Sequence, residues 1–207
     1  MIRHYLDKLN YFFIRKTIKY IIWDFDGTLY QSQKLGHDLY LTFLNIAKTK
    51  NKKLSQKKFD SYSEDLGSWS AATSKLTSIS EFKILDLADT KINKLKYIKK
   101  NRPLIKIIES TSHHYHHLIL TNSTSQEVLE CLPIIGFSEN SFEKIFSRDT
   151  THLLKPNPQI YNQILAFTKT PKFRHLFIGD SYAHDIKPTK SLGFQALPIW
   201  EIKKIFS

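Results

Sequence analysis

The sequence predicts an α/β fold, in which a parallel sheet carries helices on both faces and an all-helical unit is inserted near the start. Short apolar segments rich in β-branched residues alternate with segments of helical periodicity, a pattern typical of parallel sheets. Residues 33–102 instead show helical spacing throughout and no convincing strand. We therefore expect residues 1–32 and 103–207 to form the core and residues 33–102 to form a helical cap.

The segment before the insertion predicts one helix and one strand. Residues 1–17 are basic and carry apolar residues near helical spacing, so we expect a short amphipathic helix. This helix could serve at a membrane surface or a dimer contact, or it could simply pack on the domain. Residues 18–24, IKYIIWD, are short, apolar and β-branched, which predicts a buried strand.

The segment after the insertion alternates between the two kinds of element. Pro103 suits the first turn of a helix, Ser125 could cap another, and Gly193 would end a third. The expected strands are 117–120, 144–147, 175–179 and a short last one at 195–200. The expected helices are 103–110, 125–131, a segment following residue 155, and 185–192.

The net charge, the arginine count and the cysteine count bear on the expected partner and cellular location. The net charge of +12 invites a nucleic-acid partner, but only five of the 31 basic residues are arginine, and arginine forks dominate direct readout of bases and phosphates. Nucleic acid is therefore not the expected partner. A single cysteine, Cys131, excludes an internal disulfide, and no apolar run is long enough to cross a bilayer. We expect a cytoplasmic protein with no transmembrane segment and no secretory signal, and the oligomeric state stays open.

Polar residues follow four of the predicted strands. Asp24, Thr121, Ser147 and Asp180 each stand where a strand ends, and Lys155 comes shortly after Ser147. The carboxyl ends of parallel strands share one edge of a sheet, and ligands bind outside that edge. We therefore expect these groups, which come from distant parts of the chain, to converge on one site.

Four segments of the chain, DFDGTLY, LILTNS, LLKPNPQIY and IGDSYAHDI, resemble, in this order, the four motifs of the haloacid dehalogenase superfamily. The resemblance covers residues 18–200 and implies a Rossmann-like core with a helical cap inserted after the first motif. TLYQSQKLGHDLY is similar to the pyrimidine nucleotidase branch, and phosphoglycolate phosphatase is the other neighbour considered.

The resemblance implies a phosphatase that works through an aspartyl-phosphate. Asp24 would attack phosphorus, and Asp26 would protonate the leaving oxygen and then take a proton from water. Lys155 would supply positive charge, and Thr121, Asn122 and the backbone at Gly27 would bind the phosphate together with Lys155. The second acid, Asp26, favours phosphoryl chemistry over dehalogenation, because a halide leaves without a proton.

A metal ion would offset the repulsion between Asp24 and a phosphate. The resemblance implies Mg²⁺, held by the carboxylates of Asp24 and Asp180 and the backbone carbonyl of Asp26. Asp185 would not be a direct ligand. It would orient the ligands from outside the ligand set or contact the ion through a metal-bound water.

Several alternatives remain open. The same Asp24 intermediate could serve a phosphotransferase or sugar-phosphate mutase, or the protein could be a binding protein without turnover. The expected partner is a small phosphorylated metabolite or a nucleotide. The histidine-rich segment 113–117 is expected to be an exposed loop rather than a metal site. Tyr30 and Trp69 could touch substrate, or they could be ordinary core aromatics.

Overall fold

The computed structural model describes residues 13–206, and the chain divides into two compact units. One unit combines the described residues up to Gln31 with those from Lys99 onward, and the other is Ser32–Ile98. Among the described residues, no helix is both long and apolar enough to cross a membrane. The residues expected to form the first helix fall mostly outside the described part of the chain, and within that part residues 13–17 are helical.

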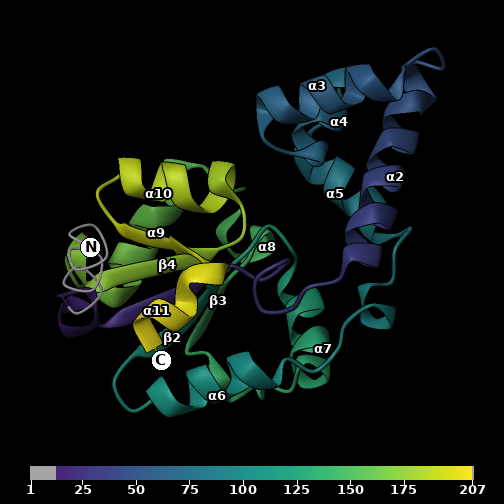
Figure 1. The fold of residues 1–207 in the computed structure, drawn as a ribbon. Helices are drawn as coiled ribbons and strands as arrows, with labels where there is room; N and C mark the ends of the chain where they lie inside the picture. Colours follow the sequence, from purple (N-terminus) through teal and green to yellow (C-terminus); the bar gives the residue numbers. More distant parts are fainter. Residues whose placement is uncertain (1–12, 207) are drawn as a thin grey trace, which may run out of the picture. The chain divides into compact units, whose positions relative to one another are not determined.

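The first unit is built on a five-stranded sheet in which every strand pair is parallel (Figure 1). The strand order is β3-β2-β1-β4-β5, so the strand that precedes the insertion lies in the middle. The strands are β1 (Tyr20–Trp23), β2 (His116–Leu120), β3 (Lys144–Phe146), β4 (His175–Gly179) and β5 (Gln195–Pro198). β1 and β4 are buried along their whole length, which explains their continuous apolar composition.

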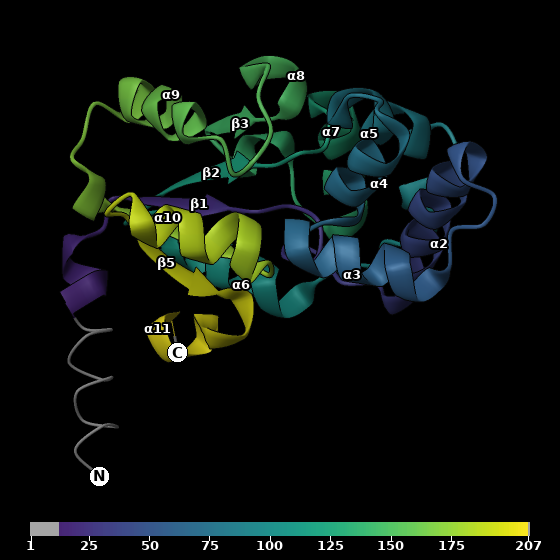
Figure 2. The ribbon, with the colours of Figure 1, turned by 90° about the horizontal axis from the view of Figure 1, so that it is seen from above.

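Helices cover both faces of this sheet. Tyr20 and Ile22 of β1 pack against Ile160 and Ile164 of α9 on one face. On the other face Trp23 reaches α6 through a buried histidine, described below. The helices are α6 (Arg102–Thr111), α7 (Ser125–Ile135), α8 (Arg148–Thr151), α9 (Pro158–Thr168), α10 (Lys187–Ser191), which lies beside β5 (Figure 2), and α11 (Ile202–Phe206). This arrangement confirms the predicted α/β fold with helices on both faces.

Side-chain caps explain where these helices begin. Asn157 accepts a hydrogen bond from the backbone of Gln159 and caps α9, which starts with a proline. α7 is capped by Thr124 and not by Ser125, so the expected cap was wrong by one residue. The Ser125 backbone and hydroxyl instead donate to Asp149 at 2.8 and 2.5 Å. A local pattern cannot distinguish two adjacent hydroxyl residues when a distant carboxylate decides between them.

The second unit consists of helices packed around its own core. The helices are α2 (Gln33–Lys50), α3 (Gln56–Leu66), α4 (Trp69–Thr77) and α5 (Glu81–Asp89), followed by a 3₁₀ turn, η1 (Lys94–Lys96). Serines 32, 55 and 68 cap the first three helices with their side chains. Phe59, Ala72 and Ile84 are fully enclosed in the core. No strand occurs in residues 32–98, all of which the structure describes. That this unit acts as a cap stays a prediction.

We predicted that the histidine-rich segment 113–117 is an exposed loop, and this prediction was wrong for its last two residues. His116 and His117 begin β2, and His117 is buried. The Trp23 indole donates a hydrogen bond to His117 Nδ1 at 3.0 Å, and the Thr111 hydroxyl lies 3.3 Å from His117 Nε2. Burial lowers the pKa of His117 to about 4, and the neighbouring His116 adds to this effect. The neutral imidazole therefore serves as a polar bridge between the sheet and α6.

We expect this buried imidazole to make the protein less stable in mild acid. In the unfolded chain a histidine titrates near 6.5, so between that value and about 4 the unfolded state binds more protons than the folded state. The contribution of His117 to the unfolding free energy should therefore fall by about 3 kcal/mol as the pH drops from 7 to 4. Urea unfolding at several pH values should show that the unfolding free energy falls less steeply with decreasing pH in His117→Gln than in the wild type. His113→Gln, at an exposed position, is the matched control, and equal slopes for all three proteins would contradict the prediction.

Candidate active site

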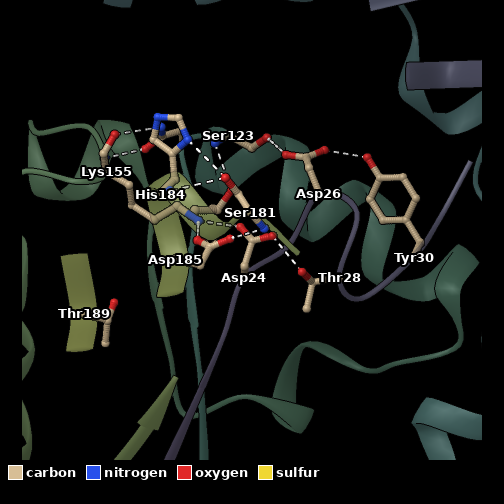
Figure 3. Close-up of polar contacts among 12 residues, drawn as sticks. Asp24, Asp26, Thr28, Tyr30, Ser123, Lys155, Ser181, His184, Asp185 and Thr189 are labelled. Carbon is tan, nitrogen blue, oxygen red and sulfur yellow. Dashed lines mark hydrogen bonds and ion pairs between the residues drawn. The ribbon is translucent and has the colours of Figure 1, made fainter. Parts of the chain in front are cut away.

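The structure brings four of the predicted site residues, Asp24, Asp26, Lys155 and Asp185, close together (Figure 3). Trp23 of β1 pairs in register with Ile119 of β2 and Ile178 of β4. Because of this register, the three strands end at the same edge of the sheet. Asp24 follows β1 directly, while Thr121 follows β2 and Asp180 follows β4.

Lys155 forms the centre of a buried ionic cluster. Its ammonium donates to Asp24 Oδ1 at 2.5 Å and to Asp185 Oδ1 at 2.7 Å. The other oxygen of Asp24 accepts from the Thr28 hydroxyl at 2.8 Å, and the other oxygen of Asp185 accepts from the Ser181 amide at 3.0 Å. All three charged side chains are buried, so both carboxylates and the ammonium have fixed orientations.

Negative charge exceeds positive charge at this point. Ligand oxygens from Asp24, Asp180 and Asp185 all lie within 4.8 Å of one another, and Lys155 is the cation bonded to two of these residues. Burial raises the pKa of Asp24 to about 8, and repulsion from Asp185 and Asp180 adds to the rise, which Lys155 only partly offsets. The two carboxylates hold the pKa of Lys155 above its ordinary value, although burial alone would lower it.

Asp180 completes the set from the rim of the site. Its side chain is exposed, yet desolvation by the surrounding protein and repulsion from Asp185 raise its pKa to about 6. A bound cation would stabilise the ionised forms of Asp24 and Asp180, whose pKa values are raised, and a set of three carboxylates suits a hard cation such as Mg²⁺. The residues present therefore fit the metal that the sequence had suggested. Among the described residues, no other group of three or more metal-ligating acidic, histidine or cysteine side chains occurs.

Two glycines make room for these carboxylates. A Cβ on Gly27, which has a φ of +79°, would lie 2.0 Å from Asp180 Oδ2. A Cβ on Gly179 would lie 2.4 Å from the side chain of Asp185. Both positions therefore need glycine, because any side chain would displace a carboxylate of the cluster.

Two hydroxyl groups donate hydrogen bonds to the Asp26 carboxylate. Tyr30 donates to its Oδ1 at 2.5 Å, and Ser123 donates to its Oδ2 at 2.6 Å (Figure 3). Tyr30 is buried and its ring lies edge-on to Phe25, so it is a core aromatic that also holds a site residue. Trp69, the other aromatic singled out, is partly exposed in α4 and its ring contacts Tyr40.

The loop after β2 contributes two residues with different contacts. The Thr121 hydroxyl oxygen accepts a hydrogen bond from the Ser123 amide at 3.0 Å. The Asn122 side chain is bonded to the backbone of Lys155, accepting from its amide at 2.7 Å and donating to its carbonyl at 3.4 Å. In this structure the Asn122 side chain therefore positions Lys155, and a role for Asn122 in binding phosphate stays a prediction.

Sequence reasoning missed several residues of this site. Thr28, Ser123 and Gly179 were not singled out, and Tyr30 was considered only as a substrate contact or core residue. Thr28 and Tyr30 lie four residues after Asp24 and Asp26, respectively, a spacing that a tight turn could have suggested. Nothing local could have revealed that Ser123 reaches Asp26, since 97 residues separate them.

Comparison with known proteins identifies a family. A model described as haloacid dehalogenase-like hydrolase matches residues 21–199 of the chain. A search of curated proteins found no match.

Solved structures share the fold at low sequence identity. A candidate haloacid dehalogenase-like hydrolase of Bacteroides fragilis has a TM-score of 0.65 at 16% identity, covering 86% of each chain. A haloacid dehalogenase family enzyme of Bacteroides thetaiotaomicron, solved with magnesium and inorganic phosphate, has a TM-score of 0.55 at 17% identity, covering 87% of this chain and 93% of its own. A candidate β-phosphoglucomutase of Thermotoga maritima has a TM-score of 0.55 at 18% identity, covering 86% of this chain and 84% of its own.

We expect Gly27→Ala to weaken the binding of a divalent cation. The added methyl group would force Asp180 away from Asp24 and Asp185, so Mg²⁺ affinity measured by calorimetry should fall by about 10-fold or more. Gly36→Ala is the matched control, because a Cβ at Gly36 meets nothing within 4 Å. Equal Mg²⁺ affinities for the two variants would show that the close approach at Gly27 does not shape the site.

Proposed function

Because the chain belongs to the haloacid dehalogenase-like hydrolase family, a family of enzymes, we propose that it is a Mg²⁺-dependent phosphatase acting on a small phosphomonoester. The observation that carries the proposal is the carboxylate cluster of Asp24, Asp180 and Asp185 around a single lysine. An anionic substrate could not approach this cluster without a further positive charge. A divalent cation would supply that charge beside the residue that has to attack the phosphate.

The metal would be held by carboxylate oxygens of Asp24 and Asp180, with the Asp26 carbonyl as a further ligand. When bound, Mg²⁺ neutralises charge on the phosphoryl oxygens and on Asp24. Asp185 would either complete the ligand set or, through its bond to Lys155, hold the ammonium next to Asp24.

Asp24 is the proposed nucleophile. One of its oxygens would form a bond to phosphorus while the bond from phosphorus to the leaving oxygen breaks, leaving an aspartyl-phosphate. Lys155 and Thr28 orient the carboxylate before attack, since each donates to one of its two oxygens. Lys155 also supplies fixed positive charge: one ion pair at 4 Å and an effective dielectric constant of 20 is worth about 4 kcal/mol. The buried lysine thus lowers the cost of adding negative charge to the site.

Asp26 is the proposed acid and base. Its carboxyl proton would pass to the leaving oxygen as that bond breaks, which produces an alcohol and leaves Asp26 ionised. The ionised carboxylate would then accept a proton from the water that attacks the aspartyl-phosphate. This second step releases inorganic phosphate and returns Asp24 and Asp26 to their starting states.

Thr121 and the backbone near Gly27 would bind the phosphoryl oxygens of the substrate. The Thr121 hydroxyl oxygen accepts from the Ser123 amide, and its hydrogen would be donated to a phosphoryl oxygen. The positive φ at Gly27 turns the backbone away from the strand direction just after the two acids. Both groups would bind any phosphomonoester alike, so they support the reaction class and not a particular substrate.

Removal of the metal or of the nucleophile should abolish turnover. With 4-nitrophenyl phosphate as substrate, EDTA should stop release of nitrophenol and added Mg²⁺ should restore it. Asp24→Asn should lower kcat by about 10⁴-fold, because the amide is a poor nucleophile. Asp65→Asn, an exposed substitution in α3, should leave kcat unchanged. Turnover that persists in EDTA or in Asp24→Asn would overturn the proposed mechanism, and a wild type without turnover would indicate a binding protein.

The fate of the phosphoryl group distinguishes hydrolysis from transfer. Asp26→Asn should still react with 4-nitrophenyl phosphate, whose leaving group needs no proton, but should lose the base for the second step. We therefore expect the phosphorylated protein to accumulate in this variant, with the label on Asp24 detectable by mass spectrometry. Wild-type protein should release phosphate to water at the same rate with or without a sugar phosphate. Phosphoryl transfer to the sugar in preference to water would instead indicate a mutase.

A further inference from the structure

The carboxylate of Asp26 is held from two sides by groups on different loops. Tyr30 donates to one oxygen and Ser123 to the other, at 2.5 and 2.6 Å (Figure 3). Bonds of this length between a hydroxyl and a carboxylate are among the stronger hydrogen bonds in proteins. With both oxygens engaged, the side chain cannot rotate about its own bonds without losing at least one of them.

The local fold brings Tyr30 back to Asp26. The amides of Thr28 and Leu29 both donate to the Phe25 carbonyl, which closes a tight turn, and Asp26 and Tyr30 then form an isolated β-bridge. The Tyr30 ring is buried against Phe25. Burial and the adjacent Asp26 raise the pKa of Tyr30, so the phenol keeps its proton and acts as a donor at any working pH.

Ser123 is fixed just as firmly from the other loop. It is buried, its amide donates to the Thr121 hydroxyl oxygen, and its carbonyl accepts from the Arg148 amide at 3.2 Å. A chain of contacts therefore runs from Thr121 through Ser123 to Asp26. The same short loop that would bind the phosphate also orients the group that would protonate the leaving oxygen.

We propose that Tyr30 and Ser123 are positioning residues that together aim the Asp26 carboxyl group at the leaving oxygen of the substrate. This inference rests on the proposed function, in which Asp26 is the acid. Neither residue need touch the substrate, because each acts through Asp26. Restricting a reacting group to a productive orientation removes an entropic cost from the transition state, which is how such residues accelerate a reaction.

This role has a consequence that a purely structural role would not have. In the step concerned, the oxygen–phosphorus bond of the substrate breaks and the Asp26 proton moves to that oxygen. A weakly acidic leaving group such as phenol needs this proton, whereas 4-nitrophenol leaves readily as an anion. Loss of Tyr30 or Ser123 as a donor should therefore slow phenyl phosphate much more than 4-nitrophenyl phosphate.

The test compares kcat/KM for these two substrates in the full-length protein with saturating Mg²⁺. The ratio kcat/KM covers steps up to departure of the leaving group, so it is independent of the later hydrolysis. In Tyr30→Phe and in Ser123→Ala we expect a fall of about 10-fold or more for phenyl phosphate and less than about 3-fold for 4-nitrophenyl phosphate. Both substitutions remove only a hydroxyl group, and thermal unfolding checks that each variant remains folded.

Tyr97→Phe is the matched control, since the Tyr97 hydroxyl donates to the Asp38 carboxylate at 2.8 Å within the inserted unit. It loses the same kind of bond and should change neither value. Equal losses for both substrates, unchanged values, or a gain with phenyl phosphate in Tyr30→Phe and Ser123→Ala would each overturn the positioning role while leaving the phosphatase reaction intact. A wild type that turns over neither substrate would overturn the proposed function and this inference with it.

Discussion

The crowding of carboxylates around Lys155 is the interaction on which the rest of the site depends. Asp24 and Asp185 are buried and share one ammonium, and Asp180 lies close enough to add a third charge. Burial and the neighbouring carboxylates raise the pKa values of Asp24 and Asp180, which reflects this excess of negative charge. Such a cluster is costly in a folded protein unless a further cation joins it, so the same crowding that raises these pKa values also suits the site to a metal ion.

The sheet makes this crowding possible. Because β1 is central and parallel to both neighbours, the chain leaves three adjacent strands at the same edge. Gly27 and Gly179 then allow two carboxylates to approach the backbone more closely than any side chain would permit. The Asn122 side chain is hydrogen-bonded to the backbone of Lys155, which fixes the position from which the ammonium reaches Asp24 and Asp185. The glycines and Asn122 therefore set the geometry of the site, while the aspartates and Lys155 set its charge.

Residues at strand ends were predictable because a parallel sheet has only one carboxyl edge. Asp24, Thr121 and Asp180 could be assigned to one edge of the sheet from their position after apolar segments. The structure places Asp180 beside Asp24, which is paired with Lys155, and Thr121 follows the neighbouring strand at the same edge. Their catalytic roles stay predictions. The neighbours that hold these residues were not predictable, because the choice between adjacent candidates such as Thr124 and Ser125 depends on a distant partner, here Asp149.

The sequence by itself determined the fold class, the helical character of the insertion and the identity of the acidic residues at the strand ends. These features follow from periodicity and from the order of apolar and polar segments, which are local properties. Only the tertiary structure decided that Ser123 and Tyr30 both hold Asp26 and that His117 is a buried neutral bridge to Trp23. The physical reason is that a hydrogen bond is specified by the positions of two groups within a few tenths of an ångström, and packing across the whole domain sets those positions.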